Sequence, residues 1–309
     1  MTPMHAVITG ATGMIGSALV RACLAEGMQV TALVRTASQR MGNLPESDRL
    51  RVIDCDVRSL SGITKAQVGQ ADFFFHLAWI GSAPSGRGLL HAQVDNVQYT
   101  VDAVELAGRL GCTAFVGTGS QAEYGRVEGD LTAETPTRPE TGYGVAKLAA
   151  GQMSRLACEQ LDIRHEWARI LSIYGPGDAA HTMVMSVIAD ACAGRSPQCT
   201  KGEQLWDYLY CDDCAQALLA MALHGADGAV YPVGSGRQRR LSAFIKEICA
   251  VAHPQVTPDL GARPYMDKQV MNLRADITAL TEDTGFIPQV SFEDGIARTI
   301  EWYRSKHVA

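Results

Sequence analysis

The chain has 309 residues, of which 47% are hydrophobic and 19% are charged, which provides enough apolar side chains for a large buried core. Its formal net charge is −6, and no run of Lys and Arg exceeds two residues, which argues against a nucleic-acid surface and a polybasic membrane anchor. The composition therefore predicts a soluble protein with a small-molecule partner, built as one large domain with a smaller appendage.

The cysteines and the ends of the chain predict a reducing compartment. Nine cysteines are scattered without a framework spacing, and the single C-x-x-C motif, Cys211 to Cys214, has no second pair beside it, so we expect free thiols and no metal site. The first expected strand begins within a few residues of Met1, which leaves no room for a signal peptide, and no apolar run approaches the roughly 18 residues that span a bilayer. We therefore expect a cytoplasmic protein.

The first element is an apolar run, 6–8, followed at once by a glycine turn and a helical pattern of apolar residues. In this turn Gly10 and Gly13 would let the backbone approach a pyrophosphate, and Gly16 would let the helix pack closely on the strand. The N–H groups at the start of the helix would face the phosphates. The spacing is one residue longer than the usual fingerprint. However, a second strand follows at 29–34, so a dinucleotide site is favoured over an ordinary tight turn.

Strands and helices then alternate along the chain. Further strands are expected at 51–57, 72–78, 114–118 and 165–173, and helices at 94–110 and 143–161. This alternation predicts an α/β fold with a doubly wound parallel sheet.

The pattern loosens after residue 173. Helices are expected at 212–224 and 241–252, and a last helix is expected to start at a capping pair, Ser291 and Asp294. We place a dinucleotide-binding domain at 1–172, with part of 205–232 returning to it. A smaller C-terminal α/β substrate-binding domain is expected at 173–309, over the carboxyl ends of the strands.

Tyr143 and Lys147 are four residues apart near the start of an expected helix, so both lie on one face. A cation about 4 Å from a phenol, at an effective dielectric constant near 20, is worth roughly 4 kcal/mol, which would lower the pKa of Tyr143 from about 10 toward neutrality. The phenol could then exchange a proton with a substrate hydroxyl. Ser120, after the strand 114–118, is placed to hydrogen-bond the reacting oxygen. Alone, each residue has a structural explanation; the preceding dinucleotide motif favours catalysis.

The chain resembles the extended short-chain dehydrogenases/reductases, specifically the nucleotide-sugar epimerase/dehydratase group, over nearly its whole length. The resemblance rests on Thr9–Gly16, Asp56-Val57, His76–Trp79, Asn96-Val97, Ser120 with Tyr124-Gly125, Tyr143-x-x-x-Lys147, Tyr174–Gly177 and Asp207–Asp213. It implies a Rossmann fold, a nucleotide-sugar substrate, and a homodimer joined through the helices 94–110 and 143–161.

The resemblance also implies roles for individual residues. The implied catalytic residues are Ser120, Tyr143 and Lys147. The expected cofactor-binding residues, among which the glycines and Arg35 follow from the sequence itself, are Gly10, Thr12, Gly13, Met14, Ile15, Gly16, Arg35, Asp56, Val57, Leu77, Ala78, Asn96, Tyr143 and Lys147. The expected substrate-binding residues are Gln121, Trp206 and Arg263. Of these, Asp56 and Val57 flank the adenine, Leu77 and Ala78 line the pyrophosphate and ribose, and Lys147 binds the nicotinamide ribose.

Three chemistries compete within this group. Dehydratases carry Thr-Asp-Glu where this chain has Ser120, Gln121 and Ala122, and Glu123 comes one position late, so that on an extended backbone it would face the other way. We therefore set 4,6-dehydration aside, which leaves reduction of a 4-keto group or 4-epimerisation. A non-catalytic dinucleotide sensor is a remote alternative.

The end of the second strand bears on the cofactor. An NAD site usually has a carboxylate there, whereas this chain has Arg35 and no acid before Glu46. Arg35 fits a 2′-phosphate, although it could also be a solvated turn residue, so NADP is favoured and NAD is the alternative. An epimerase commonly recycles bound NAD and a biosynthetic reductase consumes NADPH, so Arg35 favours reduction.

The segment 199–208 resembles the corresponding part of CDP-abequose synthases, which are 4-keto-6-deoxysugar reductases. Two residues depart from the wider group: Trp206 stands where an Arg usually grips the pyrophosphate, and Ser172 stands where an Asn is common. Arg263 matches a second phosphate-binding Arg of the group. Trp206 either stacks on the base or sugar or fills the core. His76, after a run of Phe, is expected to be a packed core histidine.

Overall fold

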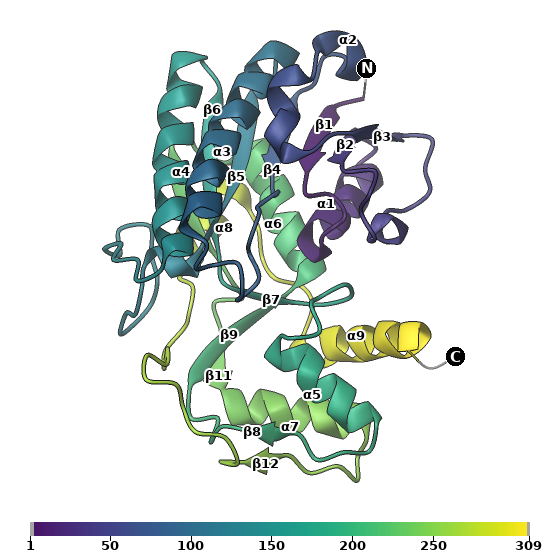
Figure 1. Ribbon diagram of the computed structural model, residues 1–309, viewed down its shortest axis with the longest axis vertical. Helices are drawn as coiled ribbons and strands as arrows, with labels where there is room; N and C mark the ends of the chain where they lie inside the picture. Colours follow the sequence, from purple (N-terminus) through teal and green to yellow (C-terminus); the bar gives the residue numbers. More distant parts are fainter. Residues whose placement is uncertain (1–2, 308–309) are drawn as a thin grey trace.

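The computed structural model describes residues 3–307, and its larger part is a seven-stranded sheet (Figure 1). In spatial order the strands are β10 (Ala229–Val233), β6 (Arg164–Ile170), β5 (Ala114–Ser120), β4 (Phe73–His76), β1 (His5–Thr9), β2 (Gln29–Val34) and β3 (Leu50–Asp54). Every neighbouring pair is parallel. The predicted doubly wound sheet is confirmed.

Helices cover both faces of this sheet (Figure 1). One layer contains α2 (Lys65–Val68), α3 (Leu90–Leu110) and α4 (Gly142–Gln160), and the other contains α1 (Met14–Ala25), α6 (Cys211–His224) and α8 (Thr278–Thr284). Alternation along the strands divides the core between them: Val7 and Phe74 pack toward α3, while Ile8 and Phe75 pack toward α1 and α6. Apolar strand residues on both faces explain why the sheet is buried on both sides.

A smaller group of elements lies below the carboxyl ends of the strands (Figure 1). It contains the strands β7 (Ser172–Tyr174), β9 (Leu205–Tyr210) and β11 (Gln238–Arg240) in one sheet, β8 (Gln198–Cys199) and β12 (Asp259–Leu260) in another, and the helices α5 (Met183–Cys192), α7 (Leu241–Ala252) and α9 (Phe292–His307). Short 3-10 helices are η1 (Met41–Asn43), η2 (Val57–Gly62) and η3 (Gln121–Glu123). At the start of α9 the Ser291 hydroxyl accepts a hydrogen bond from the Asp294 N–H at 3.1 Å, as the capping pair predicted.

The expected single strand at 165–173 is wrong. The chain leaves the large sheet after β6, passes through Leu171, and enters the three-stranded sheet as β7. The Leu171 N–H still bonds the carbonyl of Val233 on β10, at 3.0 Å, so the two sheets diverge at this residue. The third strand also ends earlier than expected, at Asp54, because the Asp56 side chain accepts from the Arg58 N–H and starts η2.

The nine cysteines are free, and all except the half-buried Cys192 are buried. Burial raises the pKa of both Cys23 and Cys158 to about 12. Within residues 3–307, no helix is both long enough and apolar enough to cross a membrane.

Candidate active site

The glycine turn between β1 and α1 holds the backbone where side chains would not fit. Gly10 has φ +71°, and a Cβ there would lie 2.8 Å from the backbone nitrogen of Ala78. A Cβ at Gly16 would overlap the carbonyl oxygen of Gly10. Gly13 is the N-cap residue of α1 and makes no side-chain cap, so the first-turn N–H groups are available to phosphate oxygens. This cradle fits a dinucleotide.

A cavity of about 440 Å³ opens from this turn at the carboxyl ends of β1 to β4. The predicted cofactor residues in its wall are Gly10, Thr12, Gly13, Arg35, Asp56, Val57, Leu77 and Ala78. Met14, Gly16 and Asn96 are not wall residues. The Asn96 carboxamide bonds both the N–H and the carbonyl of Ile80, at 2.8 and 2.9 Å, so it supports a wall residue instead of contacting the space.

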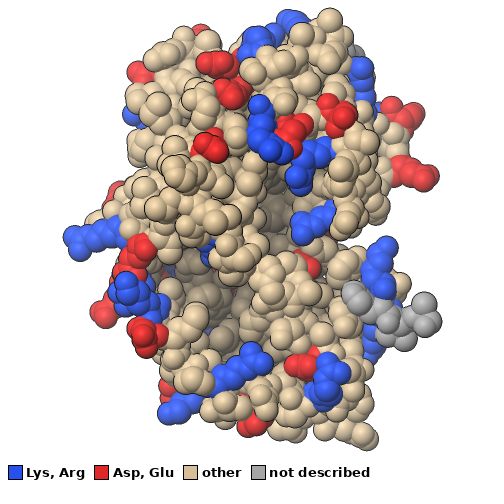
Figure 2. All heavy atoms as spheres, in the orientation of Figure 1, with Lys and Arg blue, Asp and Glu red and all other residues tan. Residues whose placement is uncertain are grey.

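The wall of this cavity is rich in positive charge after β2. Arg35, Ser38 and Arg40 line it, and Figure 2 shows Lys and Arg side chains gathered around a hollow on this face. The acidic Asp56 is engaged by Arg58 through both carboxylate oxygens, at 2.8 and 2.9 Å. These hydrogen bonds, with the charges of Arg58 and Arg35, lower the pKa of Asp56 to about 2. The β2 end therefore offers cations to a ligand.

A second cavity, of about 510 Å³, shares Leu77, Trp79 and Ser82 with the first. Its predicted residues are Ile15, Leu77, Ser120, Gln121, Tyr143, Lys147 and Trp206. They come from the first turn of α1, the segment after β4, the end of β5 with η3, the start of α4 and the small sheet, so the fold brings the proposed catalytic residues together with Trp206, a proposed substrate residue. Arg263 lies exposed in the loop after β12 and does not line either cavity.

The start of α4 places Tyr143 and Lys147. The Thr141 hydroxyl caps the helix by accepting from the Gly144 N–H at 3.1 Å. One turn later, the Lys147 ammonium donates to the carbonyl of Thr118 at 2.6 Å and lies 3.8 Å from the centre of the Trp79 ring. Lys147 is therefore buried and directed toward β5.

The expectation that the pKa of Tyr143 is lowered toward neutrality by Lys147 is wrong. Burial raises the pKa of Tyr143 above its ordinary value, opposed by a hydrogen bond with Ser120 and by the charge of Arg87. The Lys147 ammonium lies 5.9 Å from the centre of the phenol ring, and burial lowers its own pKa to about 7. Desolvation outweighs the attraction because both groups lie in the interior.

Arg87 is a site residue that the sequence analysis missed. Its guanidinium carbon lies 4.7 Å above the centre of the Tyr143 ring, and its Nε donates to the Ser82 carbonyl at 2.8 Å. The signal in the sequence was only a cation in a glycine-rich loop after β4, where many arginines are solvated. Other cavity residues that were not predicted are Trp79, Asp178, Thr182 and Tyr208.

Comparison with known proteins identifies the family. The model described as "NAD dependent epimerase/dehydratase family" matches residues 6–234, which is most of the chain. The chain belongs to this family.

Relatives in the epimerase/dehydratase family match at full length. A dTDP-glucose 4,6-dehydratase of Streptomyces griseus is 30% identical, with 98% of this chain and 94% of that protein covered. A UDP-glucose 4-epimerase of Mycolicibacterium smegmatis is 28% identical, with 98% and 99% covered. Among solved structures, the UDP-glucose 4-epimerase of Thermotoga maritima with UDP-glucose superposes with a TM-score of 0.85 at 24% identity, over 98% of this chain and 99% of that one. These relatives include a nucleotide-sugar dehydratase and nucleotide-sugar epimerases, and the predicted resemblance to this family is confirmed.

Glu123, which follows Ser120, Gln121 and Ala122 in the chain, is engaged inside the protein and does not line the second cavity. It lies in η3, not on the extended backbone that was expected, and it is fully buried. Its carboxylate accepts from the Ser120 N–H at 2.7 Å, the Trp167 Nε1–H at 3.1 Å and the Arg169 Nε–H at 2.8 Å. It is not a wall residue of the second cavity, and Gln121 is.

The two departures from the epimerase/dehydratase family pattern contact each other. The Trp206 indole N–H donates to the Ser172 hydroxyl at 2.9 Å, and both side chains line the second cavity. Trp206 is half-buried at that wall, so it is open to a ligand on one side.

His76 is a packed core histidine, as predicted. It is buried, its Nδ1 lies 3.0 Å from the Thr9 hydroxyl, and burial with the nearby Lys147 charge lowers its pKa to about 3. It is therefore neutral at physiological pH. In the described part of the chain, no cluster of three or more His, Cys, Asp and Glu side chains could hold a metal ion.

Proposed function

We propose that this protein is an oxidoreductase acting at C4 of a nucleotide-linked sugar, and that it reduces the 4-keto group of a 4-keto-6-deoxyhexose with NADPH. A bound nicotinamide cofactor would supply the hydride to the sugar carbon. Tyr143 gives its phenolic proton to the sugar oxygen, Ser120 holds that oxygen by a hydrogen bond, and Lys147 binds the nicotinamide ribose. The support is the shared wall of the two cavities, which brings the three residues beside the dinucleotide cradle.

The observation that carries reduction is the charge at the end of β2. Arg35, Ser38 and Arg40 line the first cavity where a carboxylate for the ribose of NAD would be expected. Guanidinium groups and a hydroxyl suit a 2′-phosphate, so NADP is the proposed cofactor. NADPH is consumed by reductases, whereas an epimerase returns its cofactor unchanged.

Elimination of water is disfavoured by the residues beside Ser120. Gln121, an amide, lines the second cavity, whereas Glu123 does not line it and forms a buried ion pair with Arg169.

A 4-epimerase with tightly bound NAD is the second candidate, because the M. smegmatis relative is named as such and matches at full length. It would use Ser120, Tyr143 and Lys147 in the same way. For either activity we propose that Gln121 and Trp206 contact the sugar, and that Arg263 meets the diphosphate from the loop after β12.

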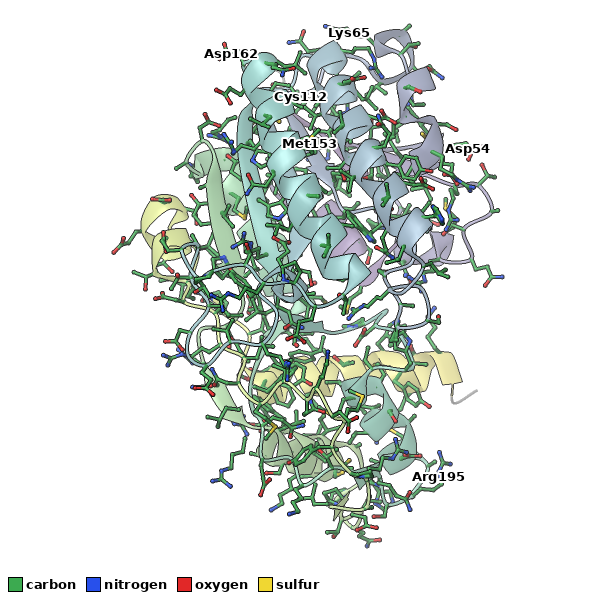
Figure 3. The ribbon with its side chains drawn as sticks, turned by 60° about the vertical axis from the view of Figure 1, so that its left-hand side comes forward. Asp54, Lys65, Cys112, Met153, Asp162 and Arg195 are labelled. Carbon is green, nitrogen blue, oxygen red and sulfur yellow. The ribbon has the colours of Figure 1, made fainter. Side chains whose placement is uncertain are left out.

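We also infer that residues 1–172, with part of 205–232, bind the cofactor, and that the remainder of 173–309 binds the nucleotide sugar. We further propose a homodimer through α3 and α4, which lie side by side at the front of Figure 3 with Met153 on α4. Large apolar side chains are exposed on these helices and their flanks: Leu89, Leu90, Val94, Val145, Met153, Leu156 and Leu161.

The test is to give the purified protein a nucleotide-linked 4-keto-6-deoxyglucose with NADPH or NADH. Stoichiometric oxidation of NADPH, preferred over NADH, supports the proposal. Interconversion of UDP-glucose and UDP-galactose with no net change in cofactor supports the epimerase, and formation of a 4-keto-6-deoxy product from nucleotide-linked glucose would show that dehydration was wrongly set aside. Tyr143→Phe should abolish turnover and keep dinucleotide binding; a pure sensor would be indifferent to it.

A further inference from the structure

The loop between β4 and α3 places a cation directly over the proposed proton donor. The guanidinium carbon of Arg87 is 4.7 Å from the centre of the Tyr143 ring. Its Nε is held by the Ser82 carbonyl, and within residues 3–307 its two terminal nitrogens have no hydrogen-bond partner. The Trp79 indole also contacts the Tyr143 ring, with centroids 6.0 Å apart and the ring planes at 83°. The phenol ring therefore has both a guanidinium and an indole as neighbours.

Arg87 is the nearer and the more permanent positive charge. The Lys147 ammonium is 5.9 Å from the centre of the phenol ring, is bonded to the Thr118 carbonyl, and is buried. With its pKa lowered to about 7, Lys147 loses its charge within the physiological range, whereas a guanidinium stays charged.

We propose that Arg87 is a positioning residue for proton transfer: its guanidinium, held over the ring of Tyr143, stabilises the phenolate. The attraction between a cation and an aromatic face grows when the ring takes up negative charge, because the interaction is electrostatic. The inference rests on the proposed role of Tyr143 as the proton donor.

Several charged or titratable groups surround the phenol. They are Arg87 on the loop, Lys147 on α4, Glu123 in η3, and Asp178 and Tyr208 across the cavity. Arg87 acts to lower the pKa of Tyr143, and Glu123 acts to raise it. Burial raises the pKa of Asp178 and of Tyr208, so both are more readily neutral than free side chains. Of these charged groups, Arg87 is the one whose charge lowers the pKa of Tyr143, so its removal should raise that pKa.

The first test measures Tyr143 without any reaction. In protein labelled with ¹³C at the tyrosine ring carbon that bears the hydroxyl, the Tyr143 signal is assigned by its loss in Tyr143→Phe and followed against pH. Arg87→Met should raise the pKa of Tyr143 by about one unit, the size expected for one cation over a ring, and Arg87→Lys should restore part of it. Arg126→Met is the matched control. Arg126 is exposed and pairs with Glu140 near the start of α4, and its substitution removes the same charge.

The second test follows the pH dependence of kcat. Because Tyr143 must be protonated to reduce the ketone, the alkaline limb of the reduction profile should move to higher pH in Arg87→Met, with KM little changed. A Tyr143 pKa that is the same in wild type and Arg87→Met overturns the inference, as does a raised KM with an unchanged pH profile, which would make Arg87 a contact for an anionic substrate group. If the wild type reduces and epimerises nothing, the proposed function fails, and the NMR titration still decides the role of Arg87.

Discussion

Lys147 shows how strongly one residue can depend on its surroundings. Its side chain is 3% exposed, and burial lowers its pKa to about 7, against about 10.4 in an unfolded chain. Between these values the unfolded chain holds the proton and the folded chain does not, so this residue makes the free energy of unfolding increase with pH.

We predict that this increase disappears in Lys147→Met, which keeps the length of the side chain. Urea unfolding of both proteins at a series of pH values from about 7 to 9.5 measures it. The wild type should gain stability relative to the variant as the pH rises. Parallel curves for the two proteins would mean that Lys147 keeps an ordinary pKa in the folded state.

At Gly16, both the packing of α1 and the shape of the glycine turn require a residue without a Cβ. Because a Cβ there would overlap the Gly10 carbonyl oxygen, Gly16→Ala should push α1 away from the turn. The expected loss is about 1–3 kcal/mol of unfolding free energy, with weaker dinucleotide binding. Gly62→Ala is the control, since nothing lies within 4 Å of a Cβ at that position, and its effect should stay within about 0.5 kcal/mol. Equal losses in the two variants would contradict the packing argument.

At the scale of elements, β6 is unusual in carrying buried charge. Arg169 and Glu123 form an ion pair of 2.8 Å with side chains 5% and 0% exposed. Arg169→Met would leave the carboxylate of Glu123 without its cation in the interior, so we predict a loss of about 3–5 kcal/mol in unfolding free energy. The exposed pair of Arg126 and Glu140 gives the comparison, and Arg126→Met should cost about 0–1 kcal/mol.

Denaturant unfolding of the two methionine variants checks this prediction. The double variant Arg169→Met with Glu123→Gln should be more stable than Arg169→Met alone, because it removes the unpaired charge. If the two single variants lose the same small amount, the buried pair does not behave as an interior charge.

The elements that sequence patterns predicted are those with strong local signals. The apolar run at 6–8, the glycine turn and the helix 143–161 each follow from propensity and periodicity, and β1, α1 and α4 appear where expected. The division of 165–173 between two sheets could not be predicted, because an extended chain looks the same in either sheet. The helix α5 was missed because it lies between loops that contain Gly and Pro, and α8 was missed because its seven residues are too few to show a helical period.

The site followed the same rule. Ser120, Tyr143 and Lys147 meet because each sits at a predictable end of an element, and their pairing was visible as a spacing. The acidity of Tyr143 could not be predicted from the sequence, because it depends on burial and on Arg87, which lies in the loop between β4 and α3. Long-range contacts of this kind leave no period in the sequence.

For the whole molecule, the prediction concerns association. The side chains of Val94 on α3 and Leu156 on α4 are 67% and 44% exposed, and together with their apolar neighbours they offer a face that a second copy could cover. The double variant Val94→Glu with Leu156→Glu should sediment as a monomer if the wild type is a dimer. Ile287→Glu, which changes another exposed apolar residue away from these helices, should keep the wild-type mass. A wild type that sediments as a monomer at high concentration would rule out this interface.

The buried cysteines make thiol alkylation a reporter of core opening. Eight of its nine cysteines are buried, and burial raises the pKa of those such as Cys23, so alkylating reagents meet almost no thiolate while the chain is folded. Labelling beyond the first fast site at Cys192 must wait for the core to open. The increase in mass over time would therefore report opening of the core under native conditions. The rate of labelling at each buried cysteine would show how often the part of the core around it opens.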